Sequence, residues 1–183
     1  MADTPQLETL KGSRFGLIAD AHVHPGKGPP LPASLPEIFK GADAILALGD
    51  LGEASGLDTL EKIAPVKGVN GGDDAHGDKR LGGKLRVFSI ANLAVGALFD
   101  PEQYKLVTAK DPFNPVADFS AAASSLFGRK IDVLLCASTH RPLVAWANGV
   151  LIVDPGSPTL SQSPTVAVLE IGKGYATAVH HTP

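Results

Sequence analysis

The strongest constraint in the sequence is a set of three short apolar runs, each of which ends at polar residues. These are residues 14–19 before Asp20-Ala21-His22, residues 44–48 before Gly49-Asp50, and residues 131–136 before Ser138-Thr139-His140. Such short apolar runs are typical of buried strands. Because ligands gather at the carboxyl ends of strands in open α/β sheets, we expect these polar residues to form one site.

Helical patterns separate the first strands. One helix is predicted to begin at Ser34, a second covers residues 57–63, and a third covers residues 117–127, between Asp118 near its start and Gly128 as its C-cap. Further strands are predicted at residues 65–69, 85–93, 143–146, 150–153, 166–171 and, more weakly, 175–179. The alternating first half and the strand-rich last third indicate an α/β domain with a mainly parallel start and antiparallel closing strands.

Length and apolar content favour one domain. The chain has 183 residues, of which 44% are hydrophobic, and a chain of this length can bury roughly 70% of the surface that it exposes when unfolded. No repeat or clear linker divides the sequence, so we expect a single domain over residues 1–183. The pattern is weakest in the extended segment 97–129, where residue–proline pairs mark turns.

Composition excludes several classes of function. The net charge is −3, so nothing indicates a nucleic-acid partner or an anionic membrane surface. No apolar run reaches the ~18 residues of a membrane span, and no signal-peptide pattern is recognised, so we expect a cytoplasmic protein. The single cysteine, Cys136, excludes an intrachain disulfide framework and a cysteine metal cluster, and we expect it to be an inert core residue.

Histidine and carboxylate side chains remain as possible metal ligands. Asp20 and His22 can converge as the chain leaves its strand, and this pair suits Mn²⁺, Fe²⁺, Zn²⁺ or Co²⁺. Asp50 has two carboxylate oxygens and could bridge two ions. Each motif alone is weak, since Asp-x-His arises by chance and Gly-Asp is a common turn. Their order and their places at strand ends make a shared site the stronger interpretation.

Five blocks in order extend this pattern over most of the chain. The blocks at Asp20 and Asp50 are followed by Val66-Lys67-Gly68-Val69-Asn70-Gly71-Gly72-Asp73-Asp74, Ala137-Ser138-Thr139-His140 and Asp154-Pro155-Gly156-Ser157. With these blocks, residues 14–171 resemble the calcineurin-like metallophosphoesterases, in the small phosphodiesterase branch that also contains the retromer-subunit-like members. The resemblance implies a metallo-dependent phosphatase-like fold, which is a four-layer α/β/β/α sandwich of two mixed β-sheets flanked by helices.

The resemblance also implies a reduced metal centre. One metal would be bound by a set that is intact here: Asp20, His22, Asp50 and His140. The second metal would share Asp50, but its further ligands in the family, one asparagine and two histidines, fall here on Gly72, Ser138 and Ala91. The implied cofactor is therefore a divalent transition metal (Mn, Fe, Zn or Co), with one ion rather than two.

Several neighbouring residues could compensate for the lost ligands or contact the substrate. Asp73 could reach the second position through a loop shift, and His76 could be a replacement ligand or a proton donor to the leaving group. His24 and Ser138 are possible substrate-side residues. The plainer interpretations are that Asp74 fixes its loop and that His24 and His76 are merely exposed to solvent.

Residues outside this site are predicted to be structural. His180 and His181 lie near the C-terminus and are interpreted as a frayed tail, and Trp146 is expected in the core or at an interface. The extra segment near Phe113 could build an interface, so a homo-oligomer is possible.

The leading functional hypothesis is a metal-dependent phosphoesterase, most plausibly a phosphodiesterase, that hydrolyses a small phosphate ester through a metal-activated water. Asp50 and His76 are its candidate catalytic residues. An alternative from a different class is a catalytically silent member of the fold that serves as a binding or interaction module. A third hypothesis is that Asp73 or His76 restores a second metal.

Overall fold

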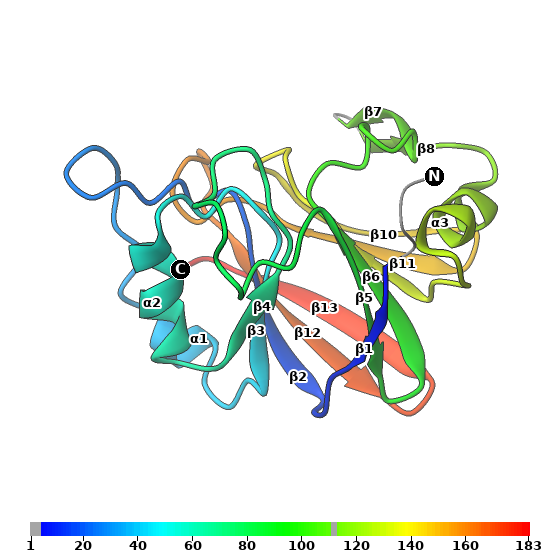
Figure 1. The fold of residues 1–183 in the computed structure, drawn as a ribbon, viewed down its shortest axis with the longest axis horizontal. Helices are drawn as coiled ribbons and strands as arrows, with labels where there is room; N and C mark the ends of the chain where they lie inside the picture. The colour runs from blue at the N-terminus through cyan, green and yellow to red at the C-terminus, as the bar shows by residue number, and fades with distance from the viewer. Residues whose placement is uncertain (1–4, 111–112) are drawn as a thin grey trace.

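The layers of the molecule run helix, sheet, sheet, helix in the computed structural model, which describes residues 5–110 and 113–183 (Figure 1). Two large sheets pack face to face. Helices α1 (Leu35–Ile38) and α2 (Ala54–Glu61) cover one sheet, and α3 (Phe119–Phe127) covers the other. This is the four-layer sandwich of two mixed sheets that the family resemblance implies.

The five-stranded sheet carries the first two ligand-bearing strands. Its order is β13-β12-β2-β3-β4, with bounds Tyr175–His181, Val166–Gly172, Arg14–Ile18, Ala44–Ala47 and Val66–Gly68. Strands β2, β3 and β4 are parallel, and β12 is antiparallel to both β2 and β13. The parallel register brings the ends of β2 and β3 to the same edge of the sheet.

The six-stranded sheet carries the third ligand-bearing strand. Its order is β1-β5-β6-β9-β11-β10, with bounds Leu7–Thr9, Leu85–Ile90, Leu93–Leu98, Val133–Leu135, Val150–Pro155 and Pro142–Ala147. Strands β6, β9 and β11 run parallel, whereas β5 is antiparallel to β6 and β10 is antiparallel to β11. The ends of β6 and β9 therefore lie at one edge and the end of β5 at the opposite edge.

The main core lies between the two sheets. Phe15, Leu17 and Leu46 of the five-stranded sheet share one buried cluster with Phe88 and Val133 of the six-stranded sheet. Smaller clusters lie under α1 and α2 and under α3. Burial of each large apolar side chain stabilises the fold by about 1.5–3 kcal/mol, so the spacing of the two sheets is fixed by packing.

Two regions differ from the predicted elements. The apolar run 85–93 is not one strand but the hairpin β5–β6, which turns at Ala91 and Asn92 with φ values of 48° and 71°. The weakly patterned segment 97–129 contains a second hairpin, β7 (Val107–Lys110) and β8 (Phe113–Pro115), before α3. In the run 85–93 the turn interrupts the apolar residues only briefly, so periodicity alone does not reveal the hairpin β5–β6.

The C-terminal region is ordered, which corrects the interpretation of His180 and His181 as a frayed tail. Both residues belong to β13, which pairs with β12 along its whole length, and Nε2 of His180 lies 2.8 Å from the carbonyl oxygen of Asp154. Trp146 does not lie in the core either, because it is on the edge strand β10 and is 66% exposed. Cys136 is buried, as predicted.

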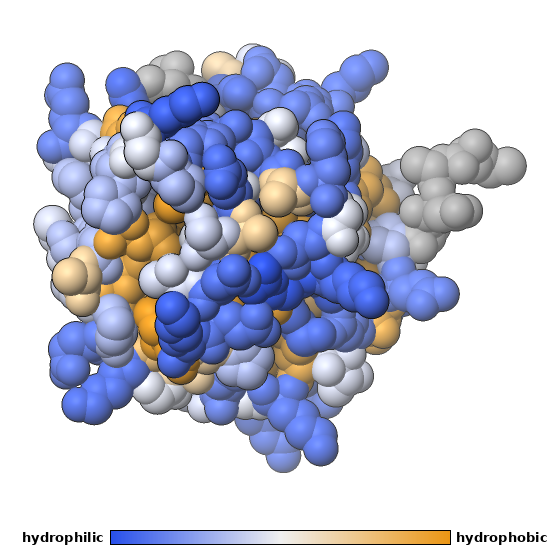
Figure 2. All heavy atoms as spheres, turned by 60° about the vertical axis from the view of Figure 1, so that its left-hand side comes forward, coloured by the Kyte–Doolittle hydropathy of each residue, from blue (hydrophilic) through white to orange (hydrophobic). Residues whose placement is uncertain are grey.

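Within the described residues, no helix is both long enough and apolar enough to cross a membrane. Seen from the side of α1 and α2, the surface is largely hydrophilic, with apolar patches between the polar side chains (Figure 2).

Candidate metal centre

The predicted ligands meet where β2, β3 and β9 end. The backbone N–H of Asp20 donates to the carbonyl of Gly49 at 3.0 Å, and the N–H of Ser138 donates to Oδ2 of Asp20 at 3.1 Å. These bonds join the loop after β2 to the loop after β3 in the same sheet and to the loop after β9 in the other sheet. The site therefore forms at the shared edge of both sheets.

The backbone at these positions is unusual. Among the described non-glycine residues, positive φ values occur at nine positions, and five of the nine belong to this site: Asp20 (51°), His22 (46°), Asp50 (52°), Ser138 (76°) and His140 (57°). Non-glycine residues adopt this left-handed region at an energetic cost, and such strain gathers at functional sites. Its concentration at four predicted ligands supports a functional role for the site.

Asp20 is the most deeply buried group of the centre. Its side chain is fully buried, and while Oδ2 accepts the Ser138 N–H, Oδ1 has no hydrogen-bond partner and lies 3.6 Å from Nε2 of His140. Burial, with a further contribution from the nearby Asp154 carboxylate, raises the pKa of Asp20 to about 8. A carboxylate in this position requires a nearby cation in order to stay ionised.

His22, Asp50 and His140 surround Asp20. Nε2 of His22 is 3.9 Å from Oδ2 of Asp50, and the rings of His22 and His140 have centroids 5.5 Å apart. Burial, with a smaller effect of the neighbouring His22, lowers the pKa of His140. A lowered pKa favours the neutral imidazole, which is the form that binds metals.

Asp74 fixes the loop that follows β4, in agreement with the prediction for this residue. Its carboxylate accepts backbone N–H groups from Asp50 (2.9 Å), Leu51 (2.7 Å) and Gly71 (2.7 Å). Burial raises the pKa of Asp74, although the three donors act in the opposite direction. Asp74 thus holds the backbone of Asp50 in place.

Asp73 joins two histidines. Its Oδ2 atom lies 2.6 Å from Nδ1 of His22 and 2.8 Å from Nε2 of His24. Partial burial works to raise the pKa of Asp73, but hydrogen bonds from the two imidazoles outweigh it and hold the pKa below its ordinary value. When Nδ1 of His22 donates to Asp73, Nε2 is left as an acceptor on the side of Asp50.

The intact residues fit a metal ion. Ligand atoms of Asp20, His22 and His140 lie within 4.8 Å of one another, and Asp50 adjoins them through His22. The buried Oδ1 of Asp20 is an acceptor without a donor, which costs about 1–3 kcal/mol if it stays unsatisfied. A cation would satisfy it. A second group within 4.8 Å consists of His22, His24 and Asp73, whose short contacts are those of hydrogen bonds.

The structure corrects one part of the lost second site. Ala91 lies in the β5–β6 turn, at the edge opposite to the centre. The strand that ends beside the centre is β6, and Phe99 and Asp100 follow it. Phe99 and Asp100 line a small cleft of about 80 Å³ together with Gly71 and Gly72. The histidine position of the family pattern therefore falls on Phe99, and the ligand is absent there too.

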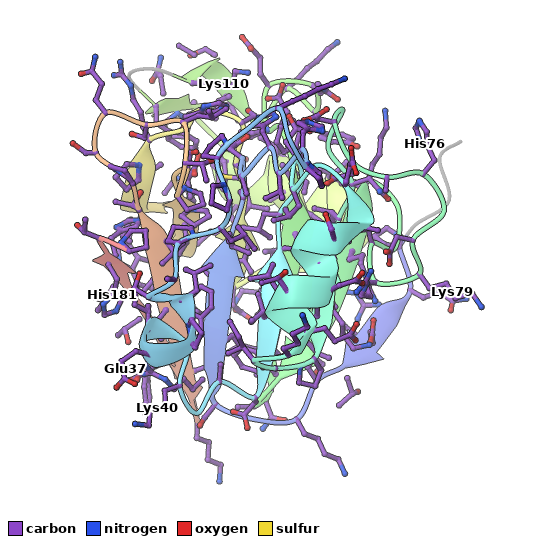
Figure 3. All side chains as sticks on the ribbon, turned by 90° about the vertical axis from the view of Figure 1, so that its left-hand side faces the viewer. Glu37, Lys40, His76, Lys79, Lys110 and His181 are labelled. Carbon is purple, nitrogen blue, oxygen red and sulfur yellow. The ribbon has the colours of Figure 1, made fainter. Side chains whose placement is uncertain are left out.

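His76 is not brought into the centre. It is exposed, projects outward from its loop (Figure 3), and belongs to neither group of potential ligands. Its spacing after Asp73 and Asp74 gave no information about direction, because a loop has no fixed periodicity.

Sequence reasoning missed several groups that support the centre. The Ser157 hydroxyl donates to the carbonyl of Asp20 at 2.7 Å, and the Thr159 hydroxyl donates to the carbonyl of Ala21 at 2.8 Å. The Thr139 hydroxyl donates to the buried Asp154 at 2.8 Å. The block Asp154-Pro155-Gly156-Ser157 at the end of β11 was the available signal for these contacts.

Known proteins resemble this chain in both sequence and structure. The model of the calcineurin-like phosphoesterase superfamily domain matches residues 14–174. A protein of Methanothermobacter thermautotrophicus, described as a probable metallophosphoesterase, is 30% identical over 159 residues, which cover 86% of this chain and 85% of the relative.

Solved structures share the fold. Vps29 of Entamoeba histolytica, solved as a complex with zinc, has a TM-score of 0.67 at 20% identity and covers 92% of this chain and 98% of its own. A structure described as a novel archaeal phosphodiesterase has a TM-score of 0.60 at 16% identity and covers 92% of this chain and 99% of its own. The family uses divalent metals and hydrolyses phosphoric esters. From the match over residues 14–174 and the ligands gathered at the sheet edge, the chain belongs to the calcineurin-like phosphoesterase superfamily.

Proposed function

We propose that this protein is a phosphodiesterase that hydrolyses a small phosphate ester at a single divalent metal ion held by Asp20, His22, Asp50 and His140. The observation that carries the proposal is the convergence of these groups around the unsatisfied Oδ1 of Asp20. Mn, Fe, Zn and Co are the candidate ions, because the set combines carboxylate and imidazole.

When bound, such an ion would lower the pKa of a water and polarise a phosphoryl oxygen. The residues of the chain have separate tasks. Asp20 and Asp50 supply the negative charge that binds the cation, while Asp73 orients His22 and Asp74 fixes the backbone of Asp50. His76 has no part in this arrangement, because it is exposed outside the site.

The proposal is tested at Asp50. We expect the purified protein to contain about one ion per chain by elemental analysis and to hydrolyse bis(p-nitrophenyl) phosphate when Mn²⁺ is added. Asp50→Asn should lower the rate by about a hundredfold or more, because several kcal/mol of transition-state stabilisation depend on the ion. Asp58→Asn removes the same charge from the exposed face of α2, where Asp58 pairs with Arg80, and should leave the rate unchanged.

Two results would contradict the proposal. Equal hydrolysis by wild type and Asp50→Asn would remove the metal role of Asp50. Two ions per chain would show that another group has replaced the lost ligands, and Asp73 would then be the first residue to substitute.

A second candidate function is an interaction module, without catalysis. It is favoured by large apolar side chains exposed on two edge strands, namely Val144 and Trp146 on β10 and Tyr175 and Val179 on β13. A second copy of the chain is one partner that either of these two edge strands could bind. Two results together would favour this function over hydrolysis. The protein would bind no metal tightly, and light scattering would show oligomers that dissociate in the Trp146→Ser variant.

A further inference from the structure

The β7–β8 hairpin brings a lysine to the metal centre. Lys110, at the end of β7, places its ammonium 3.4 Å from Oγ of Ser138 and 3.3 Å from Oδ2 of Asp100, with Glu102 at 3.6 Å. The hairpin lies at the upper rim of the molecule, beside the loops of the centre (Figure 3). The side chain of Lys110 is only 27% exposed, so it lies along the protein instead of extending into solvent.

Both contacts fall where the second metal site has been lost. Ser138 stands at one of the missing histidines, and Asp100 directly follows Phe99, which stands at another. Ser138 also donates its backbone N–H to Asp20 at 3.1 Å, so a single residue separates the ammonium from a metal ligand. Lys110 thus places a positive charge on the side of the centre where the proposed single-metal site leaves no second ion.

Within residues 5–110 and 113–183, no short ion pair holds the ammonium. Its distances of 3.3 and 3.6 Å to the carboxylates of Asp100 and Glu102 exceed the 2.7–2.9 Å that is typical of charge-assisted hydrogen bonds. The Asp100 carboxylate also accepts the backbone N–H of Glu102 at 3.0 Å. Only two of the described groups lie within hydrogen-bond distance of the ammonium, Oδ2 of Asp100 at 3.3 Å and Oγ of Ser138 at 3.4 Å. An ammonium has three donors, so one of them is left for an anion.

A cleft lies between Lys110 and the loop that carries His140. The cleft has a volume of about 140 Å³, and its lining includes Lys110, Thr139, Arg141 and Phe113. Thr139 and Arg141 are the immediate neighbours of the ligand His140 in the chain. A phosphate group at the centre could therefore extend an oxygen into this cleft.

We propose that Lys110 binds a phosphoryl oxygen of the substrate, on the side of the centre where this chain has lost its second metal site. This inference rests on the proposed function, because it takes a phosphate ester as the ligand. A lysine is a suitable point charge for phosphate. The β7–β8 hairpin within the segment 97–129 acquires a role through this residue.

The test compares Lys110→Met and Lys110→Arg with a matched control, Lys105→Met, which removes the same charge from an exposed position on the same segment. Inorganic phosphate is titrated into zinc-loaded protein and into metal-free protein by calorimetry, and the zinc content is measured in parallel. Lys110→Met should weaken phosphate binding about tenfold or more, as expected for the loss of a hydrogen bond to a charged group. Zinc content should not change, Lys110→Arg should recover most of the affinity, and Lys105→Met should match wild type.

Thermal melting followed by circular dichroism distinguishes a loss of phosphate binding from a loss of the hairpin. We expect Lys110→Met and Lys110→Arg to have the same Tm. Equal phosphate affinity in wild type and Lys110→Met overturns the inference. So does a loss of zinc in Lys110→Met, because Lys110 would then support the ligands rather than the phosphate. If no diester is hydrolysed but phosphate binding still depends on Lys110, the proposed function fails and the anion site stands.

Discussion

Asp73 contacts two imidazoles through one oxygen, and at the scale of single residues this contact decides how His22 is oriented. We expect Asp73→Asn to weaken zinc binding about 10- to 100-fold, which is the usual effect of removing a carboxylate that orients a metal-binding histidine. Competition with a fluorescent zinc chelator measures the change. Asp58→Asn should bind zinc like wild type, and an unchanged affinity in Asp73→Asn would show that His22 needs no such support.

The buried carboxylate of Asp154 makes stability depend on pH. Burial raises its pKa to about 7, although donors from Gly156 and Thr139 act in the opposite direction. The folded protein therefore holds this proton more tightly than the unfolded chain, and the resulting stability is present at low pH and lost as pH rises. In metal-free protein, urea titrations should show a free energy of unfolding that falls between the ordinary pKa of 3.8 and about 7.

The matched variant Asp154→Asn should reduce this slope. Asp20, whose pKa is also raised, to about 8, acts with the same sign and leaves a residual dependence. A slope equal to that of wild type would show that Asp154 stays ionised in the folded protein.

The positions of single residues relative to one another were predicted well where a strand fixes them. Asp20, His22, Asp50 and His140 follow strands closely, so their convergence follows from the order of the strands. The assignment of a lost ligand position to Ala91 was wrong, because the apolar run 85–93 contains a hairpin that reverses the chain. Lys110 was not predicted as part of the site, because its contact with Ser138 joins residues 28 positions apart and depends on how the hairpin folds back.

At the scale of elements, the loop after β4 must pass very close to the strand end that carries Asp50. A Cβ atom added to Gly71 would lie 2.1 Å from Oδ1 and 2.5 Å from the backbone nitrogen of Asp50, whereas one added to Gly72 would meet only Oδ1, at 3.9 Å. Gly71→Ala should therefore destabilise the protein by about 1–3 kcal/mol, as overpacking does, and displace Asp50.

Gly72→Ala is the matched control, with an expected change within about 0.5 kcal/mol. Urea unfolding and zinc titration of both variants check the pair. A Gly71→Ala variant with normal stability and zinc affinity would show that the loop can move away from Asp50 without loss.

Elements were predicted best where a long pattern is uninterrupted. Helix α3 begins after Asp118, whose side chain accepts the Ala121 N–H, and ends at the left-handed Gly128, as the caps in the sequence indicate. The hairpin β7–β8 was missed because its strands are short and half-exposed, so they carry little apolar alternation.

At the scale of the whole molecule, the centre should couple metal binding to global stability. An ion that binds only the folded state at 100 times its Kd adds about 2.7 kcal/mol, which corresponds to roughly 5–10 °C in a domain of this size. Scanning calorimetry with and without zinc should show this rise in Tm for wild type and none for Asp50→Asn. An equal rise in both proteins would place the zinc elsewhere.

The sandwich itself follows from the sequence only with the family resemblance. The strand pattern predicts an α/β domain, but the pairing of β1 with β5 and of β12 with β2 joins segments that are distant in the chain. Local periodicity holds no information about such pairings.

The centre takes Asp20, His22 and Asp50 from one sheet and His140 from the other. The four proposed ligands therefore come together only when the two sheets are packed against each other. A core substitution between the sheets, such as Leu17→Ala, would therefore be expected to alter the distances between the proposed ligands. An ion bound by these four residues would hold the two sheets together at one edge, so its affinity would depend on how well the sheets pack against each other.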